Sequence, residues 1–119
     1  MKDLKTRTKE FALSVIRLYT ELPKTTEAQI IGKQLLRSGT SVGAHYREGM
    51  RARSDSEFIS KIEGGLQELE ESSYWMELLL DAGIISECQL INLINEANEL
   101  TAILTTCSKN AKNRKGNSK

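Results

Sequence analysis

The chain has 119 residues, of which 39% are apolar and 28% charged, with a formal net charge of +1. This length suffices for one domain with its own core, but not for two. A single proline and few aromatic residues favour long helices over a sandwich or barrel. No apolar run is long enough to cross a membrane, and the first residues lack the apolar core of a signal peptide. We therefore expect a cytoplasmic protein.

The first half of the chain has the apolar spacing of two amphipathic helices. The first covers about residues 3–21 and ends before Pro23, because the residue before a proline is disfavoured in helical conformation. The second begins at Thr25 or Thr26, either of which can cap it, and continues to a break near Ser54. The predicted inward positions are Phe11, Val15, Leu18, Tyr19 and Leu22, followed by Ile31, Leu35, Ser38, Val42 and Tyr46.

Two further helices follow. Ser54 and Glu57 form a capping box that starts a third helix, which Gly83 stops after about residue 81. Ser86 caps a fourth helix that extends to about residue 108. Their predicted inward positions are Phe58, Ile62, Leu66, Leu69, Ser73, Met76 and Leu80, followed by Leu90, Leu93, Ile94, Ala97, Leu100, Ile103, Leu104 and Cys107.

Four amphipathic helices with short connections predict an all-α fold, an antiparallel up-down-up-down four-helix bundle over residues 1–108. Residues 109–119 consist mainly of lysine, asparagine, glycine, serine and arginine and contain almost nothing to bury. We predict that they form a basic disordered tail, because such a composition cannot offset the entropy of ordering the chain.

The near-neutral total hides an uneven distribution of charge. Residues 33–53 contain five cations and one acid, whereas residues 55–81 contain one cation and eight acids. At 100° per residue, four of the cations fall within an arc of about 80° on the second helix. These four residues are Lys33, Arg37, Arg47 and Arg51.

Only Thr40 and Ala44 lie on the helix face between these cations, so nothing bulky blocks a flat partner such as a phosphate backbone. Guanidinium groups pair with phosphates in bidentate fashion. The four cations are therefore our candidate nucleic-acid-binding residues. The sequence is equally consistent with a second interpretation, in which they pair with acids of the third helix such as Glu63, Glu70 and Glu71, within or between subunits.

Small and aromatic residues suggest where helices come close. Gly39, Gly43 and Gly49 each weaken an isolated helix by about 1 kcal/mol relative to alanine. Close approach of another helix would offset this loss of helix stability. In the more specific form of this hypothesis, that helix belongs to another subunit. Tyr46, Tyr74 and Trp75 could be base-stacking platforms, but aromatic residues at helical spacing more often pack in a core or an interface. We assign Gly43, Tyr46 and Trp75 to a homo-oligomer interface.

The sequence gives little support for catalysis. His45 is the single histidine, whereas a di-iron site in a bundle usually requires two Glu-x-x-His units. No glycine-rich phosphate loop follows a strand, and no nucleophile elbow is present. We predict no metal, no cofactor and no enzymatic activity.

The centre of the chain carries a specific set of residues: Ser41-Val42-Gly43-Ala44, Tyr46-Arg47-Glu48, Arg51-Ala52, Ser54, Glu57-Phe58-Ile59, Lys61 and Tyr74-Trp75. This set resembles the bacterial four-helix-bundle family encoded within large-subunit ribosomal RNA intervening sequences, which is related to the accessory variability proteins of diversity-generating retroelements. The resemblance extends over about residues 11–104. It implies a ring-like homopentamer with a positively charged surface, and nucleic acid and a reverse transcriptase as partners of the retroelement relatives.

The resemblance carries Arg47 and Arg51 over as candidate nucleic-acid contacts, and Tyr46 and Glu48 as structural positions of the motif. The chain departs from the family pattern twice. His45 stands where asparagine is common, and a glycine pair at residues 64–65 stands where an alanine-rich helix is usual.

From these observations we predict a non-enzymatic, homo-oligomeric accessory protein that binds RNA or DNA through the basic face of its second helix. The alternative is a protein-interaction scaffold that docks an acidic partner or a reverse transcriptase without binding nucleic acid itself. A third hypothesis is an antitoxin or a regulator of a neighbouring gene.

Overall fold

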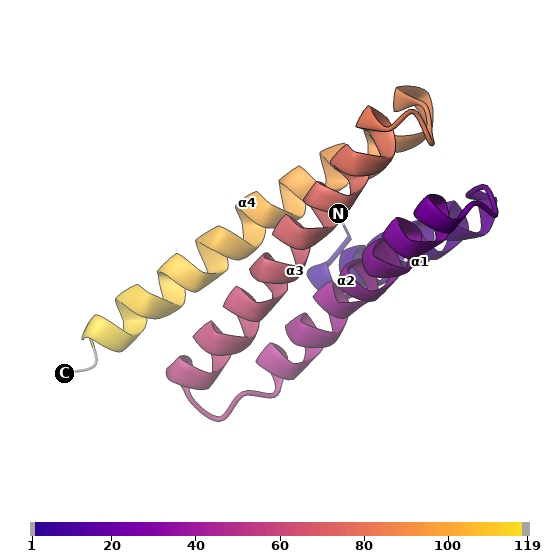
Figure 1. The fold of residues 1–119 in the computed structure, drawn as a ribbon. Helices are drawn as coiled ribbons and strands as arrows, with labels where there is room; N and C mark the ends of the chain where they lie inside the picture. The colour runs from indigo at the N-terminus through magenta and orange to yellow at the C-terminus, as the bar shows by residue number, and fades with distance from the viewer. Residues whose placement is uncertain (1, 118–119) are drawn as a thin grey trace.

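The computed structural model describes residues 2–117, and within them the chain forms four helices and no strand (Figure 1). Each helix packs against the next one in the chain, and α1 also contacts α4, though less extensively. This arrangement confirms the predicted four-helix bundle. None of the described helices combines the length and the apolar character that a membrane span requires. The helices are α1 (Leu4–Glu21), α2 (Thr26–Met50), α3 (Asp55–Asp81) and α4 (Glu87–Asn117).

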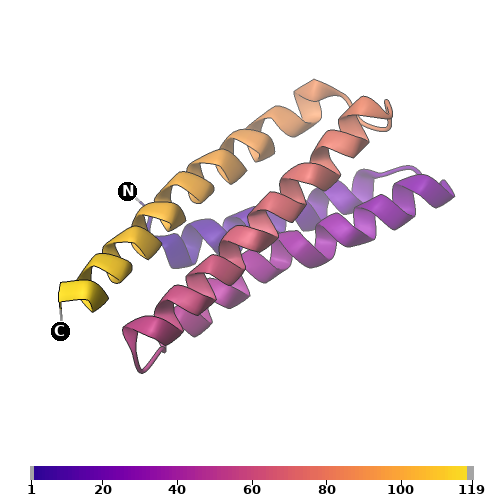
Figure 2. The same cartoon turned by 60° about the vertical axis from the view of Figure 1, so that its left-hand side comes forward.

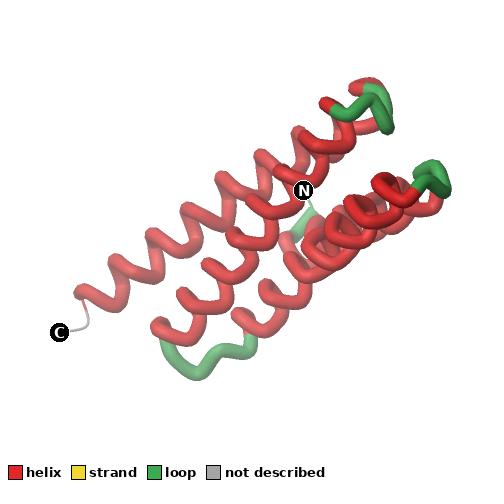
Figure 3. Tube along the Cα trace, in the orientation of Figure 1, coloured by secondary structure: helices red, strands yellow, loops and turns green. Residues whose placement is uncertain are grey.

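The helices differ in length, and this leaves one end of the bundle partly open. α1 has 18 residues and α4 has 31, which correspond to about 27 Å and 46 Å of helix. As a result α1 begins partway along α4 (Figures 1 and 2). The loops that follow α1 and α3 lie at one end of the molecule, and the loop between α2 and α3 lies at the other (Figure 3). Beside that second loop, the end of α2 extends past the start of α1.

Local capping explains the starts of three helices. The Asp3 carboxylate accepts the Thr6 N–H at 2.8 Å. The Thr25 hydroxyl accepts the Ala28 N–H at 3.4 Å. The Ser54 hydroxyl accepts the Glu57 N–H at 3.1 Å, as the predicted capping box requires, whereas the Glu57 carboxylate accepts the N–H of Arg53 at 3.2 Å in place of that of Ser54. Each bond satisfies a donor that the first turn of a helix leaves unpaired.

Neighbouring residues also explain where α1 and α3 end and where α4 begins. The residue after α1 is extended because Pro23 follows it, and α3 ends at Gly83, which has a φ of +70°. Ser86 precedes α4 and donates its hydroxyl to the Gln89 side-chain oxygen at 3.0 Å.

The core runs the length of the bundle and is apolar except for a few satisfied hydroxyls. In α1, α2 and α4 most of the predicted inward positions are buried. In α3 three of the predicted positions, Ile62, Leu69 and Met76, are fully buried, and the other four are displaced by one residue, because α3 packs against both α2 and α4. Its predicted positions Phe58, Leu66, Ser73 and Leu80 are half-buried, while the fully buried ones are Ile59, Ile62, Gly65, Leu69, Ser72, Met76 and Leu79.

The neighbour of Gly39 and Gly43 is α1 of the same chain, whereas Gly49 lies against Ile62 and Lys61 of α3. A Cβ on Gly39 would lie 2.8 Å from Val15 Cγ2, and one on Gly43 would lie 3.2 Å from the Thr8 hydroxyl oxygen. Both glycines are buried by α1. The hypothesis that a helix from another subunit approaches these glycines is therefore wrong at both positions, because the approaching helix belongs to the same subunit.

The predicted disordered tail is wrong for residues 109–117, which continue α4. Ala111 is fully buried, and the Lys112 ammonium lies 2.7 Å from a Glu63 carboxylate oxygen of α3. Arg114 lies 3.6 Å from the Asp55 carboxylate. These acids of α3 therefore pair with cations in the last turns of α4, and the composition of residues 109–117 alone does not reveal these partners. Residues 118–119 lie outside the described part of the chain.

We predict that Gly39→Ala lowers the free energy of unfolding by about 1–2 kcal/mol, measured by chemical denaturation. Overpacking a buried site costs about 1–3 kcal/mol, and the higher helix propensity of alanine returns up to about 1 kcal/mol. Val15 cannot yield easily, because its branched side chain is stiff and buried. Gly116→Ala serves as the control, since a Cβ there meets nothing within 4 Å. A Gly39→Ala variant as stable as the parent would contradict the close packing of α1 on α2.

The last turns of α4 should depend on the ionisation of Glu63. Its hydrogen bond from Lys112 holds the pKa of this carboxyl below the usual range. The pair therefore forms fully at neutral pH and is lost as the pH falls through the lowered pKa. We predict that Lys112→Ala raises the pKa of Glu63, measured by NMR titration, and speeds amide exchange in residues 109–116. An unchanged titration of Glu63 would show that Lys112 does not hold the end of the helix.

Candidate nucleic-acid interface

The four predicted nucleic-acid-binding residues lie on the exposed side of α2. Lys33, Arg37 and Arg47 belong to the helix, and Arg51 is its C-cap residue. The stripe is about 27 Å long from Lys33 to Arg51, with a gap of about 15 Å between Arg37 and Arg47. It therefore consists of two pairs of cations, and each pair has different neighbours.

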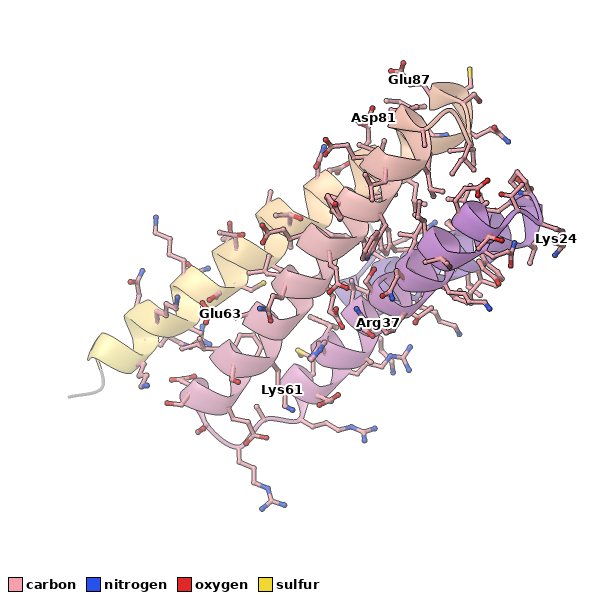
Figure 4. The ribbon with its side chains drawn as sticks, in the orientation of Figure 1. Lys24, Arg37, Lys61, Glu63, Asp81 and Glu87 are labelled. Carbon is pink, nitrogen blue, oxygen red and sulfur yellow. The ribbon has the colours of Figure 1, made fainter. Side chains whose placement is uncertain are left out.

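Arg37 follows the second interpretation of the four cations, in which they form ion pairs with acids of α3. Its guanidinium forms an ion pair with Glu71 and lies 3.7 Å from a carboxylate oxygen of Glu68. Figure 4 shows this residue on the part of α2 that runs beside α3. An intramolecular partner makes Arg37 a weaker candidate for binding phosphate, because a ligand would have to replace the two carboxylates. Lys33 is exposed and takes part in none of the ion pairs within residues 2–117.

Packing of α1 on α2 brings two more cations close to the second pair, Arg47 and Arg51. Lys5 and Lys9 of α1 line a shared hollow of 570 Å³ with Arg47 of α2. Sequence reasoning missed both lysines, because nothing in the pattern of the first helix says which helix lies beside them. We call the four exposed residues Lys5, Lys9, Arg47 and Arg51 the basic end.

The acids close to the basic end have partners of their own. Glu48 accepts a hydrogen bond from Lys61 of α3 at 2.8 Å, which lowers the pKa of its carboxyl. Glu10 pairs with Lys2 at 2.9 Å, and Asp3 caps α1. Among residues 2–117, no ion pair involves any member of the basic end. Its positive charge is therefore available to an external anion.

The predicted oligomer-interface residues have different environments. Gly43 is buried against α1, so it cannot contact a second subunit in this fold. Tyr46 and Trp75 are half-buried and pack against the core. The ring of Tyr74 meets that of Trp75 edge-on, with centroids 5.1 Å apart, and Tyr74 is 53% exposed. The buried Trp75 Nε1 has no hydrogen-bond partner within the described residues.

His45 and the glycine pair at residues 64–65 form a single packing feature. The imidazole of His45 on α2 lies over Gly64 on α3, where a Cβ would come within 2.9 Å of two ring atoms. His45 Nε2 lies 3.9 Å from a Glu68 oxygen. The glycine pair thus makes room for the larger ring at the crossing of the two helices. Within residues 2–117 no group of three or more potential metal ligands occurs, at His45 or elsewhere.

Comparison with known proteins relates the chain to one family. A family model described as "23S rRNA-intervening sequence protein" matches residues 3–106. A crystal structure of a protein with unknown function from the S23 ribosomal protein family of Bacteroides thetaiotaomicron VPI-5482 superposes with a TM-score of 0.85. The two chains are 36% identical, and the match covers 90% of this chain and 99% of the other. No curated protein matches.

Proposed function

We propose that this chain, which belongs to the 23S rRNA-intervening sequence protein family, is a non-enzymatic accessory protein that binds nucleic acid through its basic end. The observation that carries the proposal is the gathering of Lys5, Lys9, Arg47 and Arg51 around two hollows that share Lys5 and Arg47, while Glu10 and Glu48 beside them pair with other lysines.

The chemistry of this surface suits a phosphate backbone. Arginine presents a rigid fork that matches two phosphate oxygens, and lysine adds a mobile point charge. Each phosphate that a cation neutralises releases condensed counterions, so binding should weaken as salt rises. With four cations, the slope of log affinity against log salt should be about −3 to −4 for each copy. Lys33 extends the surface along α2 and adds a weaker, outlying contact.

We propose further that the protein acts as a homo-oligomer, with the ring of five subunits that the family resemblance implies. The supporting observation is the exposed ring of Tyr74, which lies edge-on against the half-buried Trp75. Contact with another subunit there would cover the tyrosine ring. An oligomer would also repeat the basic end on every copy, which strengthens binding to a long polyanion through multivalency.

The second candidate function is a scaffold that docks an acidic protein, such as an acidic surface of a reverse transcriptase. The pairing of Arg37 with two carboxylates favours it, because it shows that this face of α2 can hold acids. Such a scaffold would keep its protein partner after nuclease treatment and would bind no isolated nucleic acid.

We predict that Arg47→Glu with Arg51→Glu abolishes nucleic-acid binding, measured by fluorescence anisotropy over a series of salt concentrations. Both residues are exposed, so helicity should not change. The control is Arg17→Glu with Lys24→Glu, which makes the same change in net charge at exposed positions away from the basic end. Unchanged affinity of the first variant would remove the basic end from the proposal.

We also predict that the protein is larger than a single 13.3 kDa chain in light scattering at micromolar concentration. Tyr74→Glu should lower the mass, because it puts a charge into the proposed subunit contact. Ile30→Glu is the control, since Ile30 is similarly exposed at 59% but lies on another helix. A parent protein that scatters as one chain would refute oligomerisation.

A further inference from the structure

A second hollow lies where α1 begins beside the end of α2. It has a volume of 390 Å³, within the range of pockets for small ligands. Because α1 starts only at Leu4, it leaves the last turn of α2 uncovered on this side. We call the hollow the α1–α2 pocket, and its lining residues are Asp3, Lys5, Tyr46, Arg47, Met50 and Arg51.

The α1–α2 pocket combines apolar and cationic groups. Met50 is 62% exposed, more than any other large hydrophobic residue of the described chain. Tyr46 beside it is half-buried, and this burial raises the pKa of its phenol, which therefore stays neutral. Three cations stand around these two side chains. A site for phosphate alone does not need the apolar part, so the lining indicates a ligand with both an anionic and a flat apolar portion.

We propose that the α1–α2 pocket takes one unpaired nucleotide of a single-stranded nucleic acid. The base lies against Tyr46 and Met50, and the phosphates on either side reach Lys5, Arg47 and Arg51. This inference rests on the proposed function and deepens it, because it specifies which form of nucleic acid the basic end selects.

The contacts available in the pocket suit a base. The thioether of Met50 is polarisable and packs well against aromatic rings. Asp3 lies at the rim, where the Thr6 N–H holds one carboxylate oxygen and keeps the pKa of the group below its usual range. A charged carboxylate repels phosphate but accepts hydrogen bonds from the amino groups of bases. Asp3 therefore places the base, and not the backbone, on its side of the pocket.

The same geometry excludes a paired base. In a duplex, the bases are stacked and their faces are covered, so a base must leave the stack before a protein pocket can hold it. A duplex can still touch the cations through its phosphates. We therefore predict that single strands bind more tightly than duplexes of equal charge.

The test compares Met50→Ser with Ile30→Ser, a matched loss of an exposed apolar side chain at the other end of α2. Labelled RNA and DNA strands, the same strands with abasic residues, and the corresponding duplexes are titrated by fluorescence anisotropy. Met50→Ser should weaken binding of the intact strands roughly fivefold or more, the usual effect of losing one base contact. It should leave the abasic strands and the duplexes unchanged, and Ile30→Ser should change nothing. Met50→Leu, which keeps an apolar contact, should retain most of the affinity.

The outcomes separate the pocket from the proposed function. If the parent protein binds strands in a salt-dependent way but Met50→Ser has no effect, or weakens intact and abasic strands equally, the pocket is overturned and the proposed function stands. Duplexes that bind as tightly as strands would also overturn the pocket. If the parent protein binds none of these nucleic acids at low salt, both proposals fail.

Discussion

The seating of α1 directly on the backbone of α2 constrains everything else about this surface. Gly39 and Gly43 leave no side chain between the two helices, so Val15 and Thr8 of α1 lie against bare backbone. This contact fixes where α1 begins relative to the end of α2. As a result Lys5 comes to lie beside Arg47, and the last turn of α2 stays uncovered. A bulkier residue at either glycine would move both the cations and the pocket.

The contacts between α2 and α3 determine which cations remain available. α3 is strongly acidic, and where it runs beside α2 its carboxylates take up Arg37. Lys61 of α3 does the opposite and occupies Glu48 of α2. The first pair neutralises one cation of α2, and the second occupies an acid next to the basic end, so the region where α1 meets the end of α2 keeps its positive charge. The ring of His45 lies over Gly64 where the same two helices pack together.

Features encoded by neighbouring residues were predictable from the sequence, and features that depend on packing partners were not. The helix boundaries followed from signals such as the Ser54 capping box and Gly83, which act within a single turn. The end of α4 was predicted wrongly because its order comes from Glu63, far away in the sequence. The stripe on α2 was visible as a helical pattern, but the contributions of Lys5 and Lys9 required knowing which helix packs beside it.

The central claim is that nucleic acid binds where α1 begins and α2 ends. The most direct test is to record backbone amide shifts of the labelled protein by NMR while a single-stranded oligonucleotide is added. We predict that the perturbed amides lie in residues 3–9 and 44–53, on the surface around Arg47. Perturbations confined to residues 109–116 of α4, or the absence of any shift at low salt, would contradict binding at this surface.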